Sequence, residues 1–140
     1  MQPSIKKRLA IIILAFALFS CAGLSREQSM MWLDSKDSES SIDMTGKWDA
    51  GGIATGGWGE GNFIQEGDRF SGTLGLYNVN GKVTWDSVYM VLTSGGRVYY
   101  TARLKITDPE RMNGKAVEGA IIDSSDAQYA TSYLMTLRRF

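Results

Sequence analysis

Eleven residues in the second half of the chain alternate between two faces without a break. One set of alternate positions holds Val98, Tyr100, Ala102, Leu104 and Ile106, and the other holds Arg97, Tyr99, Thr101, Arg103, Lys105 and Thr107. Successive side chains of a β-strand point to opposite faces, so this pattern predicts a strand with one face on a core and the other in water. A one-sided strand of this kind is typical of an antiparallel sheet.

Turn-forming residues divide the chain after Met44 into short runs, and 15 of the 16 glycines lie between Gly46 and Gly119. The turn signals are Glu66-Gly67-Asp68, Asn80-Gly81, Ser94-Gly95-Gly96, Asp108-Pro109 and Asp123-Ser124-Ser125-Asp126. Such spacing predicts an all-β domain in which neighbouring strands pair antiparallel as an up-and-down meander. The predicted strands are 45–52, 57–66, 69–77, 82–93, 97–107, 111–122 and 127–139.

Seven to eight strands of this length indicate a small barrel, closed or nearly closed. A meander closes antiparallel only with an even number, so an eighth strand would come from the Met30 region or from a split of the strand 82–93. That strand changes phase, and we expect a bulge or bend near Asp86-Ser87. Two other strands have clear inward positions. They are Phe70, Leu74 and Leu76 in 69–77, and Tyr129, Tyr133, Met135 and Leu137 in 127–139.

The first twenty residues have the pattern of an export signal. A basic start with Lys6, Lys7 and Arg8 precedes eleven apolar residues, well below the ~20 that a membrane-spanning helix requires. Leu18-Phe19-Ser20-Cys21 follows and resembles the lipobox of bacterial lipoproteins, in which the enzyme that removes the signal cuts before a lipid-modified cysteine. The resemblance implies that Cys21 carries acyl chains and anchors the protein in a membrane. The sorting rule of these lipoproteins holds back chains with Asp just after the cysteine. Because this chain has Ala22 there, the resemblance implies the periplasmic face of the outer membrane.

These features divide the chain into a signal peptide at 1–20, a lipidated tether at 21–43 and a barrel domain at 44–140. The tether is rich in serine and mixed charge, which is the composition of a solvated linker. It also contains the apolar segment Met30-Met31-Trp32-Leu33. We expect this segment to pack against one end of the barrel as a plug or short helical turn, with docking to a partner or contact with lipid as the alternatives.

Composition excludes several classes of function. With no His and one Cys, the chain cannot form a Ser-His-Asp triad, a Cys-His dyad, a His-triad zinc site or an internal disulfide. Removing Lys6, Lys7 and Arg8 leaves 12 basic residues against 15 acidic ones, which argues against nucleic acid as a partner. No spacing singles out a catalytic pair among Glu60, Glu66, Asp86 and Glu118. We therefore expect no enzymatic activity, no cofactor and no metal.

The two ends of the barrel domain carry a recognisable pair of motifs, Thr45-Gly46-Lys47-Trp48 at the start and Leu137-Arg138-Arg139 at the close. This pairing resembles the calycin superfamily of lipocalins and avidins, in which a Gly-x-Trp on the first strand is covered by an Arg from the last. The resemblance implies that Gly46 lets the backbone pass closely and that Arg138 or Arg139 stacks on Trp48. The avidin ligand residues do not carry over, since Ala50 and Leu74 occupy two of their places, so biotin binding is not expected.

Aromatic residues supply the candidate ligand site. The expected contacts are Trp58, Glu60, Asn62, Trp85, Tyr89, Tyr100 and Tyr133. If these side chains face inward they line an aromatic cup, with Glu60 and Asn62 as polar contacts, and the competing interpretation is that the aromatic residues fill the core.

Two functions follow. The first is a membrane-anchored, non-enzymatic barrel that binds a small hydrophobic ligand. The second is a protein-binding inhibitor of a secreted protease or lysozyme, and a structural envelope module is a further possibility. A cavity of about 300 Å³ or more would favour the first, whereas a filled core with a projecting apolar N-terminal segment would favour the second.

Overall fold

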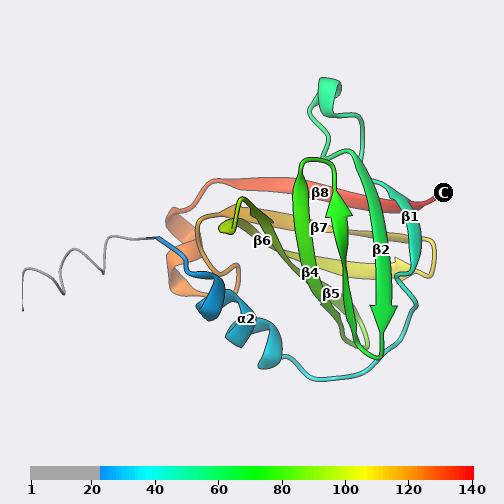
Figure 1. Cartoon of the computed structure of the whole chain (residues 1–140), viewed down its shortest axis with the longest axis horizontal. Coiled ribbons are helices and arrows are strands. Elements are labelled where there is room, and N and C mark those ends of the chain that lie inside the picture. The colour runs from blue at the N-terminus through cyan, green and yellow to red at the C-terminus, as the bar shows by residue number, and fades with distance from the viewer. Residues whose placement is uncertain (1–22) are drawn as a thin grey trace, which may run out of the picture.

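Eight antiparallel strands close into a barrel in the computed structural model, which describes residues 23–140. In chain order they are β1 (Gly46–Asp49), β2 (Glu60–Glu66), β3 (Arg69–Leu74), β4 (Tyr77–Val83), β5 (Ser87–Ser94), β6 (Arg97–Asp108), β7 (Arg111–Glu118) and β8 (Ser132–Arg139). Each strand pairs with the next and β8 pairs back with β1 (Figure 1). The predicted up-and-down meander and its closure are confirmed.

The eighth strand arises because the two predicted strands 69–77 and 82–93 form three strands. The chain turns at Gly75 and Leu76, so Leu76, predicted to point inward, is 75% exposed. Asn80-Gly81, predicted as a turn, lies inside β4. A Cβ at Gly81 would stand 2.1 Å from the ring of Phe70, so this glycine makes room for the core.

The bulge or bend predicted near Asp86-Ser87 is a bend at Trp85 and Asp86, where the chain turns from β4 into β5. A register shift does occur in β5, between Leu92 and Thr93. The last predicted strand begins later than expected, because Ser125–Tyr129 forms the short 3₁₀ helix η2. Tyr129, predicted to point inward, is therefore 86% exposed.

Large apolar side chains fill the barrel interior. The fully buried ones include Trp48, Phe63, Leu74, Met90, Leu92, Leu104, Met112, Met135 and Leu137. They alternate along their strands with exposed positions, as in β2, where Phe63 is buried between exposed Asn62 and Ile64. Each such burial contributes about 1.5–3 kcal/mol, so this cluster supplies the main drive for folding.

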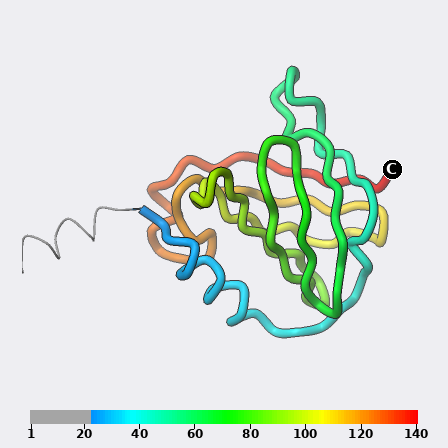
Figure 2. The backbone as a smooth tube through the Cα atoms, in the orientation of Figure 1, coloured from blue at the N-terminus to red at the C-terminus, as the bar shows by residue number. Residues whose placement is uncertain are grey.

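One helix, α2 (Arg26–Asp34), packs on the outside of the wall at β5 and β6 (Figures 1 and 2). It starts at a capping box, in which the Ser25 hydroxyl accepts a hydrogen bond from the Gln28 amide and the Gln28 side chain bonds the Ser25 amide. Trp32 and Leu33 lie against Val91 of β5. The apolar segment is thus helical and packed on the barrel, as expected, but it covers a side of the barrel and not an end.

This packing explains why β5 has no wet face. Residues Ser87 to Thr93 are all buried, alternately toward the core and toward α2. A strand covered on both faces has a continuous apolar run in place of alternation.

Residues after α2 also lie against the barrel. The Ser40 and Ser41 hydroxyls donate to the carbonyls of Gly67 and Thr84, and the Met44 amide donates to Gln65. From Ser25 onward, the segment expected to be a solvated linker is therefore attached to the domain. The predicted signal peptide and Cys21 lie outside the described residues, and no helix within 23–140 is long and apolar enough to cross a bilayer.

Candidate functional site

The barrel has two unlike ends. We call the end formed by the residues before β1, the β6–β7 turn and the last residues of β8 the arginine end. The opposite end, where the β1–β2 and β3–β4 connections lie, is the aromatic end. Both ends contain a tryptophan that follows a Gly-x pattern, Trp48 and Trp58 respectively.

At the arginine end, Trp48 is fully buried and its indole nitrogen donates to the Met44 carbonyl at 2.9 Å. The guanidinium of Arg139 lies 4.2 Å from the centre of the Trp48 ring, so the predicted cation-π contact is present. Arg139 also donates to the carbonyls of Asp43, Thr45 and Pro109. This end of the barrel is sealed.

Two neighbours of this contact have different roles from those the motif implies. Arg138 points outward and is exposed, so the covering residue is Arg139. Gly46 has a φ of 121°, while a Cβ there would meet only Arg139 at an ordinary 3.8 Å. The glycine is therefore needed for its backbone conformation and not for close approach.

At the aromatic end, four rings form the feature that we call the aromatic cup: Trp58, Tyr77, Tyr100 and Tyr133. Tyr100 is central, with ring centres 5.0 Å from Trp58, 5.5 Å from Tyr77 and 5.8 Å from Tyr133, each pair nearly perpendicular. Edge-to-face pairs of this kind are favourable and hold the rings in a defined arrangement.

The barrel topology brings these four residues together. Tyr77, Tyr100 and Tyr133 point into the barrel near the starts of β4, β6 and β8. Each lies two residues closer to the aromatic end than a buried residue of the same strand, Val79, Ala102 and Met135 respectively. Trp58 lies just before β2, and its indole nitrogen donates to the Leu134 carbonyl at 3.0 Å. The four rings consequently come from four separate segments of the chain.

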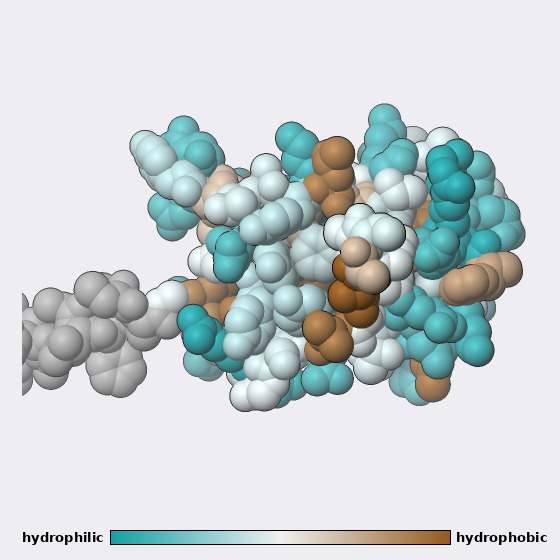
Figure 3. Space-filling view, turned by 90° about the horizontal axis from the view of Figure 1, so that it is seen from above, coloured by the Kyte–Doolittle hydropathy of each residue, from teal (hydrophilic) through white to brown (hydrophobic). Residues whose placement is uncertain are grey.

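The cup encloses a hollow of about 220 Å³. Besides the four rings, Ile53, Leu76 and the backbone of Gly56 and Gly57 line it. Ile53 belongs to the short 3₁₀ helix η1 (Ile53–Thr55) in the loop between β1 and β2, which projects from this end (Figure 1). Figure 3 looks onto the side from which this loop projects, and shows hydrophobic side chains gathered among hydrophilic ones.

The surroundings of Tyr100 shift its pKa. Burial, followed by the hydroxyl of Tyr77 and the nearby charge of Glu118, raises the pKa of Tyr100 to about 12. The phenol therefore stays neutral at any physiological pH and can both donate and accept a hydrogen bond. The cup thus offers aromatic surface with neutral polar groups.

Only three of the seven expected contacts meet in the cup: Trp58, Tyr100 and Tyr133. Glu60 and Asn62 lie on the outer face of β2, where Glu60 stands 3.8 Å from Lys47, because Gly59 at a φ of 99° changes the direction of the strand after Trp58. Trp85 is 70% exposed in the β4–β5 turn at the other end.

Tyr89 lies on the outer wall beneath α2. Its ring makes an edge contact with Trp32, and the ammonium of Lys36 stands 4.6 Å from its centre. The phase change in β5 had concealed this outward direction. Conversely, Tyr77, Ile53 and Leu76 line the cup but were not predicted to do so. Only a β3–β4 turn placed at Gly75 would have revealed Tyr77 and Leu76.

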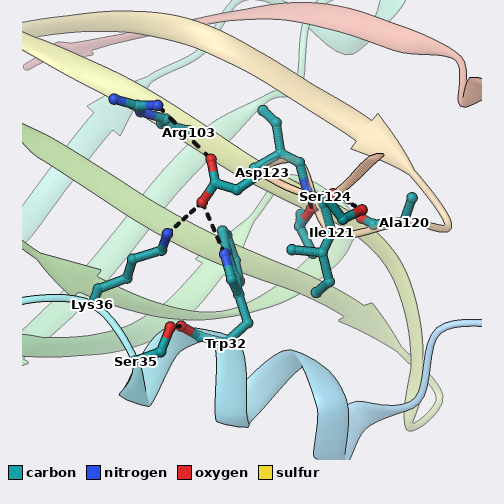
Figure 4. Close-up of polar contacts among 10 residues, drawn as sticks. Trp32, Ser35, Lys36, Arg103, Ala120, Ile121, Asp123 and Ser124 are labelled. Atoms are coloured by element: carbon teal, nitrogen blue, oxygen red, sulfur yellow. Dashed lines mark hydrogen bonds and ion pairs between the residues drawn. The ribbon is translucent and has the colours of Figure 1, made fainter. Parts of the chain in front are cut away.

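One partly exposed carboxylate helps to hold α2 on the barrel (Figure 4). Asp123 accepts a hydrogen bond from the Trp32 indole at 3.0 Å and pairs with Lys36, while Arg103 lies 3.8 Å away. Burial opposes ionisation, but the bonds from Lys36 and Trp32 and the nearby cationic charges outweigh it and hold the pKa of Asp123 below its usual value. The carboxylate is charged at neutral pH and fixes the helix to the β7–β8 loop.

The described residues 23–140 contain no cluster of three or more carboxylate or thiol side chains that could hold a metal. No family model matches the chain, and neither a similar curated protein nor a similar solved structure was found. The aromatic cup is therefore interpreted from its own chemistry.

Proposed function

We propose that this chain is a membrane-anchored binding protein that holds a small apolar or planar group in the aromatic cup. The observation that carries this proposal is the meeting of Trp58, Tyr77, Tyr100 and Tyr133, from four separate segments, around an open hollow. Aromatic walls with a few neutral hydroxyls are typical of sites for ligands of this kind.

The size of the hollow limits the ligand. Drug-sized molecules occupy pockets of about 300–1,000 Å³, and this cup of about 220 Å³ falls below that range. Apolar side chains already fill the interior beneath it. The ligand is therefore a single ring or short chain, or a larger molecule of which only one ring enters.

The anchor and the family are part of the same proposal. A lipid on Cys21 would keep the protein at a membrane, with the outer membrane favoured by Ala22. The closed barrel of eight meander strands and the stacking of Arg139 on Trp48 support a calycin-like origin. The cup would then use the open end of such a barrel.

A second candidate is a protein that inhibits a secreted hydrolase. Ile53 and Leu76 line the cup and are exposed, which gives it an apolar rim that suits a protein surface. The apolar segment around Trp32, expected to project in such an inhibitor, is packed on the barrel. In this version, the rim and not the N-terminal segment contacts the target.

Tryptophan fluorescence tests the proposal directly. Residues 23–140, which contain all the packing described above, would be titrated with small aromatic and aliphatic compounds. We expect saturable quenching that is lost in Trp58→Phe and kept in the matched control Trp85→Phe, because Trp85 is exposed at the opposite end. If no compound changes the emission, the small-ligand proposal fails and the inhibitor becomes the leading candidate.

The anchor requires a separate measurement. Mass spectrometry of the protein from a membrane fraction should show acyl chains on Cys21. An unmodified, freely soluble protein would contradict the anchor and leave the cup proposal unaffected.

A further inference from the structure

The outer face of three neighbouring strands carries a concentration of positive charge. We call it the basic wall, and it consists of Arg103 and Lys105 on β6, Arg111 and Lys115 on β7, and Arg138 on β8. All five are exposed, because they alternate with interior residues such as Leu104, Met112 and Leu137.

The pairing register places like charges directly opposite each other. Arg103 faces Lys115 across β6 and β7, and Arg111 faces Arg138 across β7 and β8. Directly opposed like charges destabilise a sheet, so folding gains nothing from these two pairs. An external anion would offset the repulsion.

Carboxylates of the protein neutralise the wall only in part. Arg103 has one within 4.0 Å, that of Asp123, and no carboxylate in residues 23–140 lies within 4.0 Å of the other four cations. The register places Asp108 opposite Arg111 and Asp49 opposite Arg138, and both carboxylates also bond backbone amides. Asp108 accepts from the Glu110 amide at 2.8 Å, and Asp49 accepts from the Gly51 amide at 2.9 Å.

The rest of the molecule is acidic. Without Lys6, Lys7 and Arg8 the chain has 12 basic and 15 acidic residues, and the outer face of β2 carries Glu60 and Glu66. Five of the 12 basic residues are therefore gathered on one face, and acidic residues outnumber basic ones over the rest of the molecule.

The point where the chain enters the described structure lies near this wall. Gly23 and Leu24 share a surface hollow with Gly119, Ala120 and Ile121, which connect β7 to β8 (Figure 1). Cys21 precedes Gly23 by two residues, or at most ~7 Å of extended chain. A lipid on Cys21 would thus hold the bilayer close to one end of the strands that form the wall.

We propose that the basic wall rests on the anionic headgroups of the bilayer that holds the anchor. This inference depends on the lipid anchor of the proposed function. Lys and Arg side chains are attracted to anionic lipid within about one Debye length, and the short connection from Cys21 brings the bilayer to the β7–β8 end of the wall. The barrel would lie on its side, with the aromatic cup facing along the membrane.

Amine labelling of the lipidated full chain tests this contact. The protein would be placed in vesicles of phosphatidylcholine alone and in vesicles that also contain phosphatidylglycerol, and labelling rates would be read for each lysine by mass spectrometry. We expect Lys105 and Lys115 to react about fivefold more slowly on the anionic vesicles at low salt, and the difference to vanish in about 0.5 M salt. Lys47, on β1 beside Glu60, is the internal control and should not change.

A double variant, Arg111→Glu with Arg138→Glu, should remove the protection of Lys105, whereas the control Lys47→Glu should not. Both changes are on exposed positions, and a melting curve of each variant checks the fold. Equal rates for all three lysines on both kinds of vesicle would overturn the inference, as would protection by a soluble acidic polymer but not by anionic vesicles. If Cys21 carries no acyl chain, the anchor and this inference are both contradicted. If Cys21 is acylated but Lys105 and Lys115 are not protected on anionic vesicles, only this inference is contradicted.

Discussion

The two ends of the barrel use the same short pattern for opposite purposes. Gly46-Lys47-Trp48 places an indole that is fully buried and covered by Arg139, whereas Gly56-Gly57-Trp58 places one at the wall of an open hollow. Both indole nitrogens have a carbonyl acceptor, Met44 in one case and Leu134 in the other. The difference lies in what covers the ring, and it suggests that one end stabilises the fold while the other is available for binding.

Replacing each tryptophan by alanine would break this comparison most strongly. Trp48→Ala should lower the free energy of unfolding by about 3–5 kcal/mol, as expected for a buried aromatic side chain. Trp58→Ala should cost only about 1–2 kcal/mol, because its ring is half-buried. Denaturant unfolding of both variants measures the difference, and equal losses would contradict the assignment of roles.

The two consecutive arginines provide the next test. Arg139→Met should cost about 2–3 kcal/mol, since it removes the cation-π contact and several bonds to carbonyl groups. Arg138→Met, one residue earlier and exposed, should stay within about 0.5 kcal/mol of the parent protein. Thermal melting of the two variants side by side would show whether Arg139 is the residue that seals the end.

Alkaline pH should weaken the packing of Tyr100 at the aromatic end. The pKa of Tyr100 is about 12 in the folded protein and near 10 in the unfolded chain, so its contribution is complete below pH 10 and is lost as the pH rises through 12. The expected loss is about 1 kcal/mol for this partly exposed ring. Comparison of unfolding at pH 9 and near pH 12 with Tyr100→Phe isolates the effect, and an unchanged pH dependence in that variant would rule it out.

The smallest expected effect on stability comes from a change at the rim of the aromatic cup. Leu76→Ser alters an exposed rim residue and should change the free energy of unfolding by less than about 0.5 kcal/mol. It should nevertheless weaken the quenching of Trp58 by an apolar compound, because Leu76 lines the cup. Unaltered affinity in this variant would restrict the site to the four rings.

Strand composition and turn signals were enough to predict the barrel, and the resemblance of the two terminal motifs to the calycins implied the stacking on Trp48. The wrong strand predictions lie where a glycine could either form a turn or make room for a neighbouring side chain. Gly81 looks like a turn but makes room for Phe70, and Gly75 forms the turn that was missed. A one-residue difference in a turn reverses the inward direction of a strand, and for this reason Tyr77 was overlooked while Glu60 was expected in the site.

Alternation of side chains along the sequence determined that this protein forms two-faced strands, because a strand's period of two is a local property of the backbone. Which rings meet in the cup, which arginine covers Trp48, and that α2 lies over β5 were decided only by the tertiary structure. These contacts join residues tens of positions apart, and their partners depend on the register and closure of the whole barrel.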